Sequence, residues 1–457
     1  MKLYDAYGRE VEPARLKDEQ AAATFAGIRN IYSAMHPSAG LTPERLAAIL
    51  TEAEYGDPYQ YLELAQEMEE KDLHYLAVLG TRKEAVAQLD LIIRPASSSA
   101  EDMKIAAMVR ETLMGGAFDI ESALFDILDA IGKGFSATEI MWNTDGRYWI
   151  PERLIWRDPR WFLFDWVSGE TLLLRTLGGD SGAARPAAGS HFKSTAPLAR
   201  IASLQPFTEP LIPYKFIIHI AKAKAGLPIR GGIARAAGWA WLFKNYALKD
   251  WVTYTEVFGQ PLRVGKYGPG ATENDKNVLL NAVANIGADA AAIIPDSMVI
   301  EFTEARQQGS ADLYERFCDY LDRQVSKAVL GQTLTTETPR QGGGSRAAAQ
   351  VHDAVRRDIM GADARRLAAT ITRDLVKPIV ELNFGPQPRY PRFSIGLPED
   401  ADAKIFADTI AKLADRGLKI SQKTVLDKLG LPAPLEGEPI LAPAHAANSG
   451  GAHSGGE

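Results

Sequence analysis

Apolar positions divide the chain into a helical beginning, a β-rich middle and a second half dominated by long helices. Near the N-terminus, Thr42 stands directly before Pro43 and Glu44. This order predicts a helix start, because a hydroxyl side chain caps free amides and the fixed φ of proline suits a first turn. Apolar residues recur near helical spacing up to residue 73, so we expect residues 1–79 to be mainly helical.

The middle of the chain has the composition of half-buried strands. Five of the eight tryptophans fall between Trp142 and Trp166, among Ile, Phe, Leu and Tyr in short runs. Aromatic residues at this density favour strands, and a run of Gly, Ala, Ser and Pro from 178 to 197 predicts a loop. There is no β–α–β rhythm of a nucleotide-binding sheet, so the expected class is α+β. The elements expected up to residue 220 are a strand at 88–95, helices at 99–113 and 120–131, strands within 134–176 and a strand at 215–220.

One long helix is expected over residues 231–258, about 42 Å long at 1.5 Å per residue. Between Gly232 and Phe243 its only charge is Arg235, and a helix that is apolar nearly all round must be covered on most sides. The cover could come from neighbouring copies of the chain or from the chain's own core. Residues 260–305 then alternate strand, helix and strand, which predicts a small α/β insert between two helices.

Apolar residues at i, i+4 spacing predict a second long helix that ends at Gly331; they are Leu313, Phe317, Leu321 and Val325. The next run, from 332 to 346, holds four threonines and three consecutive glycines and predicts a loop. That loop is either a solvent-exposed linker or a mobile element that touches a partner without gripping it. A further helix is expected from 347 to about 382, with a kink or break at Gly361–Asp363. A helix pair at 401–430 and a disordered tail complete the pattern.

Composition indicates a large globular protein with a mildly acidic charge. Hydrophobic residues make up 46% and charged residues 24% of the 457, and Lys plus Arg number 51 against 58 Asp plus Glu. The net charge of −7 argues against the broad basic surface of proteins that grip DNA phosphates. The single cysteine, Cys318, excludes an intrachain disulfide framework. We expect no signal peptide, because the N-terminus is charged throughout, and no membrane span, because no window is apolar enough.

The sequence contains no motif for catalysis, metal binding or a cofactor. The cluster from Gly226 to Gly232 has the spacing of a phosphate loop, but Gly232 stands where the lysine must be, so we expect a structural turn. The seven histidines form no short-spaced ligand pair, and Cys318 has no partner cysteine, so we expect neither a metal site nor a cofactor. His219, inside an apolar strand, is interpreted as a hydrogen-bonded structural histidine, and Cys318 as a packing residue.

Several long runs of residues together resemble one family of proteins. They are Trp156-Arg-Asp-Pro-Arg-Trp-Phe162, Lys215-Phe-Ile-Ile-His219, Trp241-Leu-Phe-Lys-Asn245, Asp250-Trp251, Glu256-Val-Phe-Gly-Gln-Pro261, Ser326-Lys-Ala-Val-Leu-Gly-Gln-Thr-Leu-Thr-Thr336, Val351-His352 and Ala362-Asp-Ala-Arg365. In this order, over roughly residues 80–395, the chain resembles the portal proteins of Mu-like tailed bacteriophages and prophages. Runs of this length are more specific than any short motif. The N-terminal helices and the tail after Leu397 match less clearly.

This resemblance implies the phage portal fold, an α+β architecture with an α/β wing, long stem helices, a small α/β clip, a kinked helix and a helical crown. Matched to that order, the parts are an N-terminal helical region 1–79, the wing 80–230, the first stem helix 231–258, the clip 259–309, the second stem helix 310–331, the channel loop 332–346, the kinked helix and return 347–398, crown-like helices 399–431 and the tail 432–457. The loop residues expected to face DNA are Thr333, Thr335, Thr336, Gln341, Gly342, Gly343 and Gly344. The stem residues expected to pack between subunits are Trp239, Trp241, Phe243 and Trp251.

The resemblance also implies a function, that of the portal or head–tail connector at one capsid vertex. The chain would form a ring, expected to be a dodecamer, through which double-stranded DNA is packaged and ejected. Expected partners are the terminase large subunit, the major capsid protein and head-completion or tail connector proteins; the expected location is the virion, with assembly in the host cytoplasm. Twelve copies at −7 would carry about −84 charges, so tight DNA binding is not expected. The alternatives are a non-portal head scaffold or adaptor and, less favoured, a soluble hydrolase.

Overall fold

The computed structural model describes most of the chain between residues 3 and 425. The described residues are 3–5, 8–24, 29–31, 36–116, 118–144, 147–176, 208–258, 262–285, 298–303, 310–333, 346–396, 408–414, 416–418, 421 and 425. The chain divides into two units, Met1–Ile395 and Gly396–Glu457. In the second unit, residues 408–414 are helical, within the segment where a helix pair is expected, and the tail from 432 lies outside the described residues. In the described part of the chain, no helix combines the length and apolar content needed to cross a membrane.

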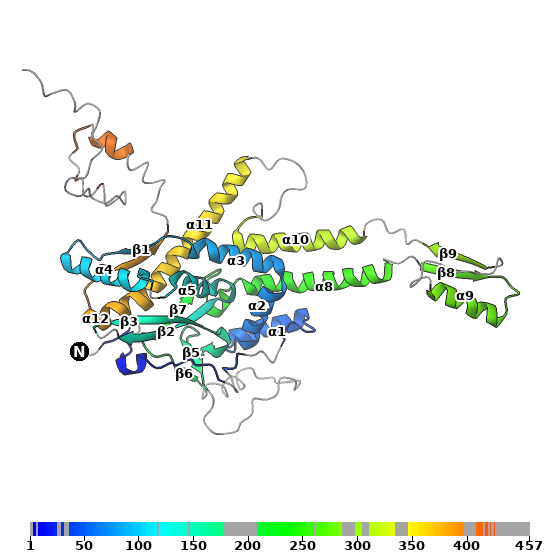
Figure 1. The fold of residues 1–457 in the computed structure, drawn as a ribbon, viewed down its shortest axis with the longest axis horizontal. Helices are drawn as coiled ribbons and strands as arrows, with labels where there is room; N and C mark the ends of the chain where they lie inside the picture. The colour runs from blue at the N-terminus through cyan, green and yellow to red at the C-terminus, as the bar shows by residue number, and fades with distance from the viewer. Residues whose placement is uncertain are drawn as a thin grey trace, which may run out of the picture. The chain divides into compact units, whose positions relative to one another are not determined.

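The first unit mixes helices and strands, which confirms the α+β class (Figure 1). Its described α-helices are α1 (Pro43–Glu54), α2 (Tyr59–Lys71), α3 (Leu73–Ala87), α4 (Ala100–Met114), α5 (Ile120–Ile127), α6 (Ala130–Lys133), α8 (Ala234–Phe258), α9 (Glu273–Asn285), α10 (Ser310–Leu330), α11 (Arg346–Ile371) and α12 (Lys377–Phe384). Its strands are β1 (Leu91–Arg94), β2 (Phe135–Thr144), β3 (Trp149–Arg157), β4 (Phe162–Phe164), β5 (Leu172–Arg175), β6 (Thr208–Pro210), β7 (Phe216–Ile220), β8 (Leu262–Tyr267), β9 (Met298–Thr303) and β10 (Arg392–Ile395).

Side chains at their first turns explain where two of the N-terminal helices begin. The Thr42 hydroxyl accepts the backbone N–H of Arg45 at 3.2 Å, so the helix start predicted there is confirmed. Asp72 separates α2 from α3, and one oxygen of its carboxylate accepts the N–H groups of His74 at 3.0 Å and Tyr75 at 3.1 Å. Asp72 therefore ends one helix and caps the next.

The strands of the β-rich middle form two three-stranded sheets. In the first, β2 lies between β3 and β7 and pairs antiparallel with both. In the second, β5 lies between β4 and β6. A separate antiparallel pair joins β1 to β10, so the strand that follows the N-terminal helices is hydrogen-bonded to the last strand of the unit. The β2–β3 ladder shifts register between Met141 and Trp142, at a β-bulge or irregularity.

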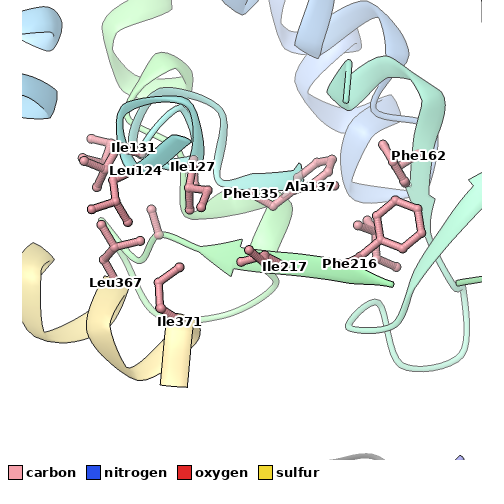
Figure 2. Close-up of a cluster of buried hydrophobic side chains, with 14 of the residues drawn as sticks. Leu124, Ile127, Ile131, Phe135, Ala137, Phe162, Phe216, Ile217, Leu367 and Ile371 are labelled. Atoms are coloured by element: carbon pink, nitrogen blue, oxygen red, sulfur yellow. The ribbon is translucent and has the colours of Figure 1, made fainter. Parts of the chain in front are cut away.

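Figure 2 shows a part of the core where helices meet the sheet of β2, β3 and β7. Its labelled residues are all buried and come from α5 or α6 (Leu124, Ile127, Ile131), β2 (Phe135, Ala137), β4 (Phe162), β7 (Phe216, Ile217) and α11 (Leu367, Ile371). The rings of Phe162 and Phe216 meet edge to face, with their centroids 6.0 Å apart. A helix from the end of the unit thus completes the core around strands from its middle.

The break predicted as one possibility at Gly361–Asp363 is wrong, because α11 continues through these residues. Asp363 pairs there with the Arg82 guanidinium at 2.7 Å. The irregularity lies about two and a half turns later, in the π-helical turn η5 (Thr372–Val376), immediately before α12 and its Pro378. A proline ring clashes with the carbonyl four residues earlier, and a wider π turn makes room for it. Proline, and not glycine, therefore sets the position of the break.

The segment between α8 and α10 contains the strand–helix–strand insert that the sequence predicts. Strands β8 and β9 pair antiparallel from Leu262↔Thr303 to Tyr267↔Met298. Helix α9 packs on β8 at Gly265, where an added Cβ would lie only 2.9 Å from Leu279 Cγ. The missing side chain at this position lets the helix approach the strand closely.

His219 on β7 is a buried, hydrogen-bonded histidine, as the sequence predicts. It is 2% exposed, and its Nδ1 lies 3.0 Å from the Thr370 hydroxyl of α11. Burial, with a smaller contribution from the nearby Arg373 and Arg366 guanidinium groups, lowers the pKa of His219 from 6.5 to about 4. The folded chain therefore keeps this ring neutral at pH values where the unfolded chain protonates it.

This shift predicts a loss of stability as the pH falls from 6.5 towards 4. The stability from neutral His219 is present above its unfolded pKa of 6.5 and is lost towards its folded pKa. We expect the contribution of His219 to the free energy of unfolding to fall by up to about 1.4 kcal/mol for each pH unit. Urea titrations between pH 7 and pH 5 should show a shallower decline for His219→Gln, which keeps a polar group near Thr370 but does not titrate. An equal decline in both proteins would contradict this assignment.

Candidate functional site

The two long helices that precede the predicted channel loop at 332–346, α8 and α10, pack against each other (Figure 1). They occupy the segments in which the sequence predicts long helices at 231–258 and 310–331. We call α8 and α10 together the stem pair. The second helix also packs on α3, which connects the pair to the N-terminal helices.

One lysine joins the three helices at this point. The ammonium group of Lys244 on α8 lies 3.0 Å from Asp72 Oδ1 and 2.6 Å from Asp322 Oδ1 on α10. Burial alone would lower the pKa of Lys244, but the carboxylates of Asp322 and Asp72 outweigh it and raise that pKa above its ordinary value. Lys244 thus stays charged and bridges the cap of α3 to both helices of the stem pair. In the sequence, the only sign of this role is a lone lysine directly after an apolar stretch.

The four stem residues predicted to pack between subunits have different surroundings. Trp241 is 5% exposed and belongs to the chain's own core, and Trp239 packs partly buried against that core. Trp251 stacks on Tyr314 of α10, with ring centroids 6.4 Å apart and planes 11° apart. Only Phe243 is exposed, at 40%. The first half of α8 is therefore covered by its own chain, and Trp241 offers almost no surface to a neighbour.

Other large apolar side chains of the stem pair remain exposed. The set consists of Phe243, Tyr246, Leu248 and Val252 on α8 and Leu313, Phe317 and Tyr320 on α10. We call these seven residues the stem apolar set. Of the four apolar residues whose spacing predicts α10, Leu321 and Val325 are buried, whereas Leu313 and Phe317 are exposed. Exposed apolar side chains in such number on two long helices are available for contacts with another chain.

One side chain of α3 joins the end of α10, where the predicted channel loop begins, to the middle of α11. Arg82 donates one hydrogen bond to the Val329 carbonyl oxygen at 2.6 Å, near the end of α10, and another to Asp363 Oδ2 of α11 at 2.7 Å. Gly331 ends α10 with φ +70°, and a Cβ there would lie 2.7 Å from Ile359 Cδ1 of α11. The end of α10 therefore passes close to α11, at the base of the loop.

The structure describes only the start of the predicted loop. Thr333 is half-buried, next to the buried Gln332. The other residues predicted to face DNA lie outside the described residues: Thr335, Thr336, Gln341, Gly342, Gly343 and Gly344.

The glycine cluster that resembles a phosphate loop forms a tight structural turn, as the sequence predicts. A Cβ at Gly232 would lie 2.5 Å from the Gly132 carbonyl oxygen, and one at Gly231 would lie 2.3 Å from the Ala221 carbonyl oxygen. Glycine is needed here because backbone segments approach each other closely. Cys318 is buried, and burial raises the pKa of its thiol, which fits a packing role. Among the described residues, no group of histidine, cysteine and carboxylate side chains could hold a metal ion.

Comparison with known proteins gives consistent matches over most of the sequence. Residues 62–431 match the family described as the portal protein of Mu bacteriophage. The Mu-like prophage FluMu protein gp29 of Haemophilus influenzae is 38% identical over 413 residues, which cover 89% of this chain and 74% of that protein. The portal protein of Escherichia phage Mu is 36% identical over 410 residues, with the same two coverages.

Among solved structures, the chain resembles one in the neck of a native gene transfer agent particle computed with C12 symmetry. The TM-score is 0.48 and the identity 12%, with coverage of 86% of this chain and 95% of that one. Both values are low, so the assignment rests on the sequence matches. Because these span most of the chain at more than a third identity, the chain belongs to the portal protein family of Mu bacteriophage, and its role is that of a portal, the head–tail connector.

Proposed function

We propose that copies of this chain close into a ring, expected to be a dodecamer, at one vertex of the capsid, and that double-stranded DNA passes through it during packaging and ejection. The observation that carries the proposal is the exposed stem apolar set in a member of the portal family. In a closed ring, each copy meets two neighbours through two different surfaces, so both helices of the stem pair can be covered.

The energy available from this contact supports the ring. Full burial of a large apolar side chain is worth about 1.5–3 kcal/mol relative to full exposure. The members of the stem apolar set are between 39% and 66% exposed, so each retains part of that energy for a contact outside the chain. Burial of several such side chains in a contact between copies would contribute favourable free energy to association.

For the loop at 332–346 we propose brief contacts with the passing duplex. Its base is fixed through Arg82 and Gly331, so its position depends on the stem pair and α11. Thr333 and the other loop residues predicted to face DNA carry no positive charge. They would offer hydroxyl, amide and backbone groups to the phosphates. At a net −7 per chain, the ring should not bind the duplex tightly, which suits a conduit that must let DNA slide.

The partners that we propose are those of a capsid vertex. They are the major capsid protein, the terminase large subunit and head-completion or tail connector proteins, first in the host cytoplasm and then in the virion. We propose no catalytic activity for the chain itself, so the terminase would supply ATP hydrolysis. The family match argues against the two alternatives, a head scaffold or adaptor and a soluble hydrolase.

The first prediction concerns ring assembly. Val252→Asp places a charge on α8 where a 58% exposed valine is proposed to meet a neighbour. A buried, unpaired carboxylate is costly, so we expect rings to be lost in negative-stain images and in analytical ultracentrifugation. Unfolding of the chain itself should change by only about 0.5 kcal/mol, because the site is exposed within one chain.

Two further variants serve as controls for that experiment. Val167→Asp makes the same chemical change at a valine that is 99% exposed and outside the stem pair, so its rings should form normally. Trp241→Ala should instead destabilise the chain itself by about 3–5 kcal/mol, because Trp241 is buried in its own core. Normal rings from Val252→Asp would contradict the proposed role of the stem apolar set.

The second prediction concerns the loop. Deletion of Gly342–Gly344 removes three residues of high backbone freedom from the segment proposed to follow the duplex. We expect normal rings, because the loop base is held by residues outside the deletion, but less nuclease-protected DNA per particle. Wild-type DNA content in particles of the deletion variant would favour the simple linker, the other interpretation of this run.

A further inference from the structure

A cavity of about 500 Å³ lies between α11 and β10, away from the stem pair and the loop. Four cationic residues line it: Arg365 on α11, Arg373 in the π turn, Lys377 on α12 and Arg392 on β10. We call this cavity the basic pocket. Such a concentration of positive charge is unusual in a chain whose net charge is −7.

The four cations differ in how far the chain itself neutralises them. Arg373 pairs with Asp374 at 2.6 Å, and the Lys377 ammonium lies 3.6 Å from Glu381. Arg365 and Arg392 are exposed, and no described residue forms an ion pair or hydrogen bond with either guanidinium group. Two guanidinium groups at one cavity are thus left for an anion from outside the chain.

The register of the β1–β10 pair adds a second, independent indication. Arg392 lies directly opposite Arg94, which is also exposed. Like charges directly opposite each other on antiparallel strands destabilise the pair. Two arginines in these positions do not stabilise the strand pair, whereas a bound anion would offset their mutual repulsion.

The interior of the basic pocket is largely apolar. Ala368 and Ala369 of α11, Phe393 and Ile395 of β10 and the ring of Tyr390 line it. The Phe393 N–H donates to the Thr372 hydroxyl at 3.1 Å, so this N–H points to the π turn that follows α11 and not to β1. A ligand that fits here has anionic groups for the arginines and small apolar groups for the interior, in an extended form that follows the strand.

These features favour a peptide over a nucleic acid. A duplex is a broad cylinder whose phosphates contact surfaces, and it cannot enter a cavity of about 500 Å³ to reach an apolar lining. We propose that the basic pocket binds an extended acidic segment of a partner protein, with carboxylates on Arg365 and Arg392 and apolar side chains against Ala369 and Phe393. Guanidinium groups pair with carboxylates in a bidentate geometry, which gives such a site specificity as well as affinity.

The experiment uses the full chain and a fluorescein-labelled octapeptide of alternating glutamate and valine, with binding followed by fluorescence anisotropy. We expect saturable binding that weakens as salt rises. The double variant Arg365→Gln with Arg392→Gln should bind at least about tenfold more weakly, since two charge-assisted contacts are lost. Its Tm should not fall, because one like-charge pair is removed and both side chains are exposed.

Three comparisons decide the outcome. Arg357→Gln changes an arginine of α11 that is 70% exposed and pairs with Asp353, so it should leave peptide binding unchanged. A peptide with glutamine in place of glutamate should bind much more weakly, and a short duplex DNA should not displace the acidic peptide. Equal binding by the double variant, equal binding of the glutamine peptide, or displacement by duplex DNA would each overturn the proposal.

Discussion

The packing of the long helices depends on the ion pairs of Lys244. Its ammonium group is the only one among the described residues that joins α8, α10 and the cap of α3 in a single cluster. Asp72 has two tasks here, because the carboxylate that caps α3 also accepts the lysine. The aromatic stack of Trp251 on Tyr314 holds the two helices together farther along, where no core supports them. If the lysine were lost, two carboxylates would remain close together without their cation, which would destabilise the junction of α8, α10 and α3.

The sequence predicted the element order well, because apolar spacing and helix-start residues act locally. The helix start at Thr42, the strand–helix–strand insert and the end of α10 at Gly331 are all where these signals put them. The apolar spacing was less informative about which apolar residues are buried. Leu313 and Phe317 share the spacing of Leu321 and Val325, yet only the latter pair is buried, because α10 extends beyond the body that covers its second half. Apolar spacing defines one face of a helix, but it does not tell how much of the length of that face is covered by the rest of the chain.

The functional residues that were missed act over long distances in sequence. Arg82 meets Val329 and Asp363 across about 250 to 280 positions, and no local pattern reports such a contact. The same is true of the basic pocket, whose arginines come from α11 and β10 and are not a charge run in the sequence. The family resemblance supplied the role, but the arrangement of charges had to come from the fold.

The hydrogen bonds of Arg82 to Val329 and Asp363 have a consequence for how the sequence of this protein can evolve. Arg82 and Gly331 already hold the end of α10 against the middle of α11, so the two helices do not depend on the 332–346 segment to stay together. Closure entropy grows only with the logarithm of loop length, so adding or removing a few residues changes the free energy of folding by only about a few tenths of a kcal/mol. Natural variants can therefore differ freely in the length and composition of this segment. Selection on this segment then acts on its proposed contacts with the passing duplex, almost independently of selection on the stability of the fold.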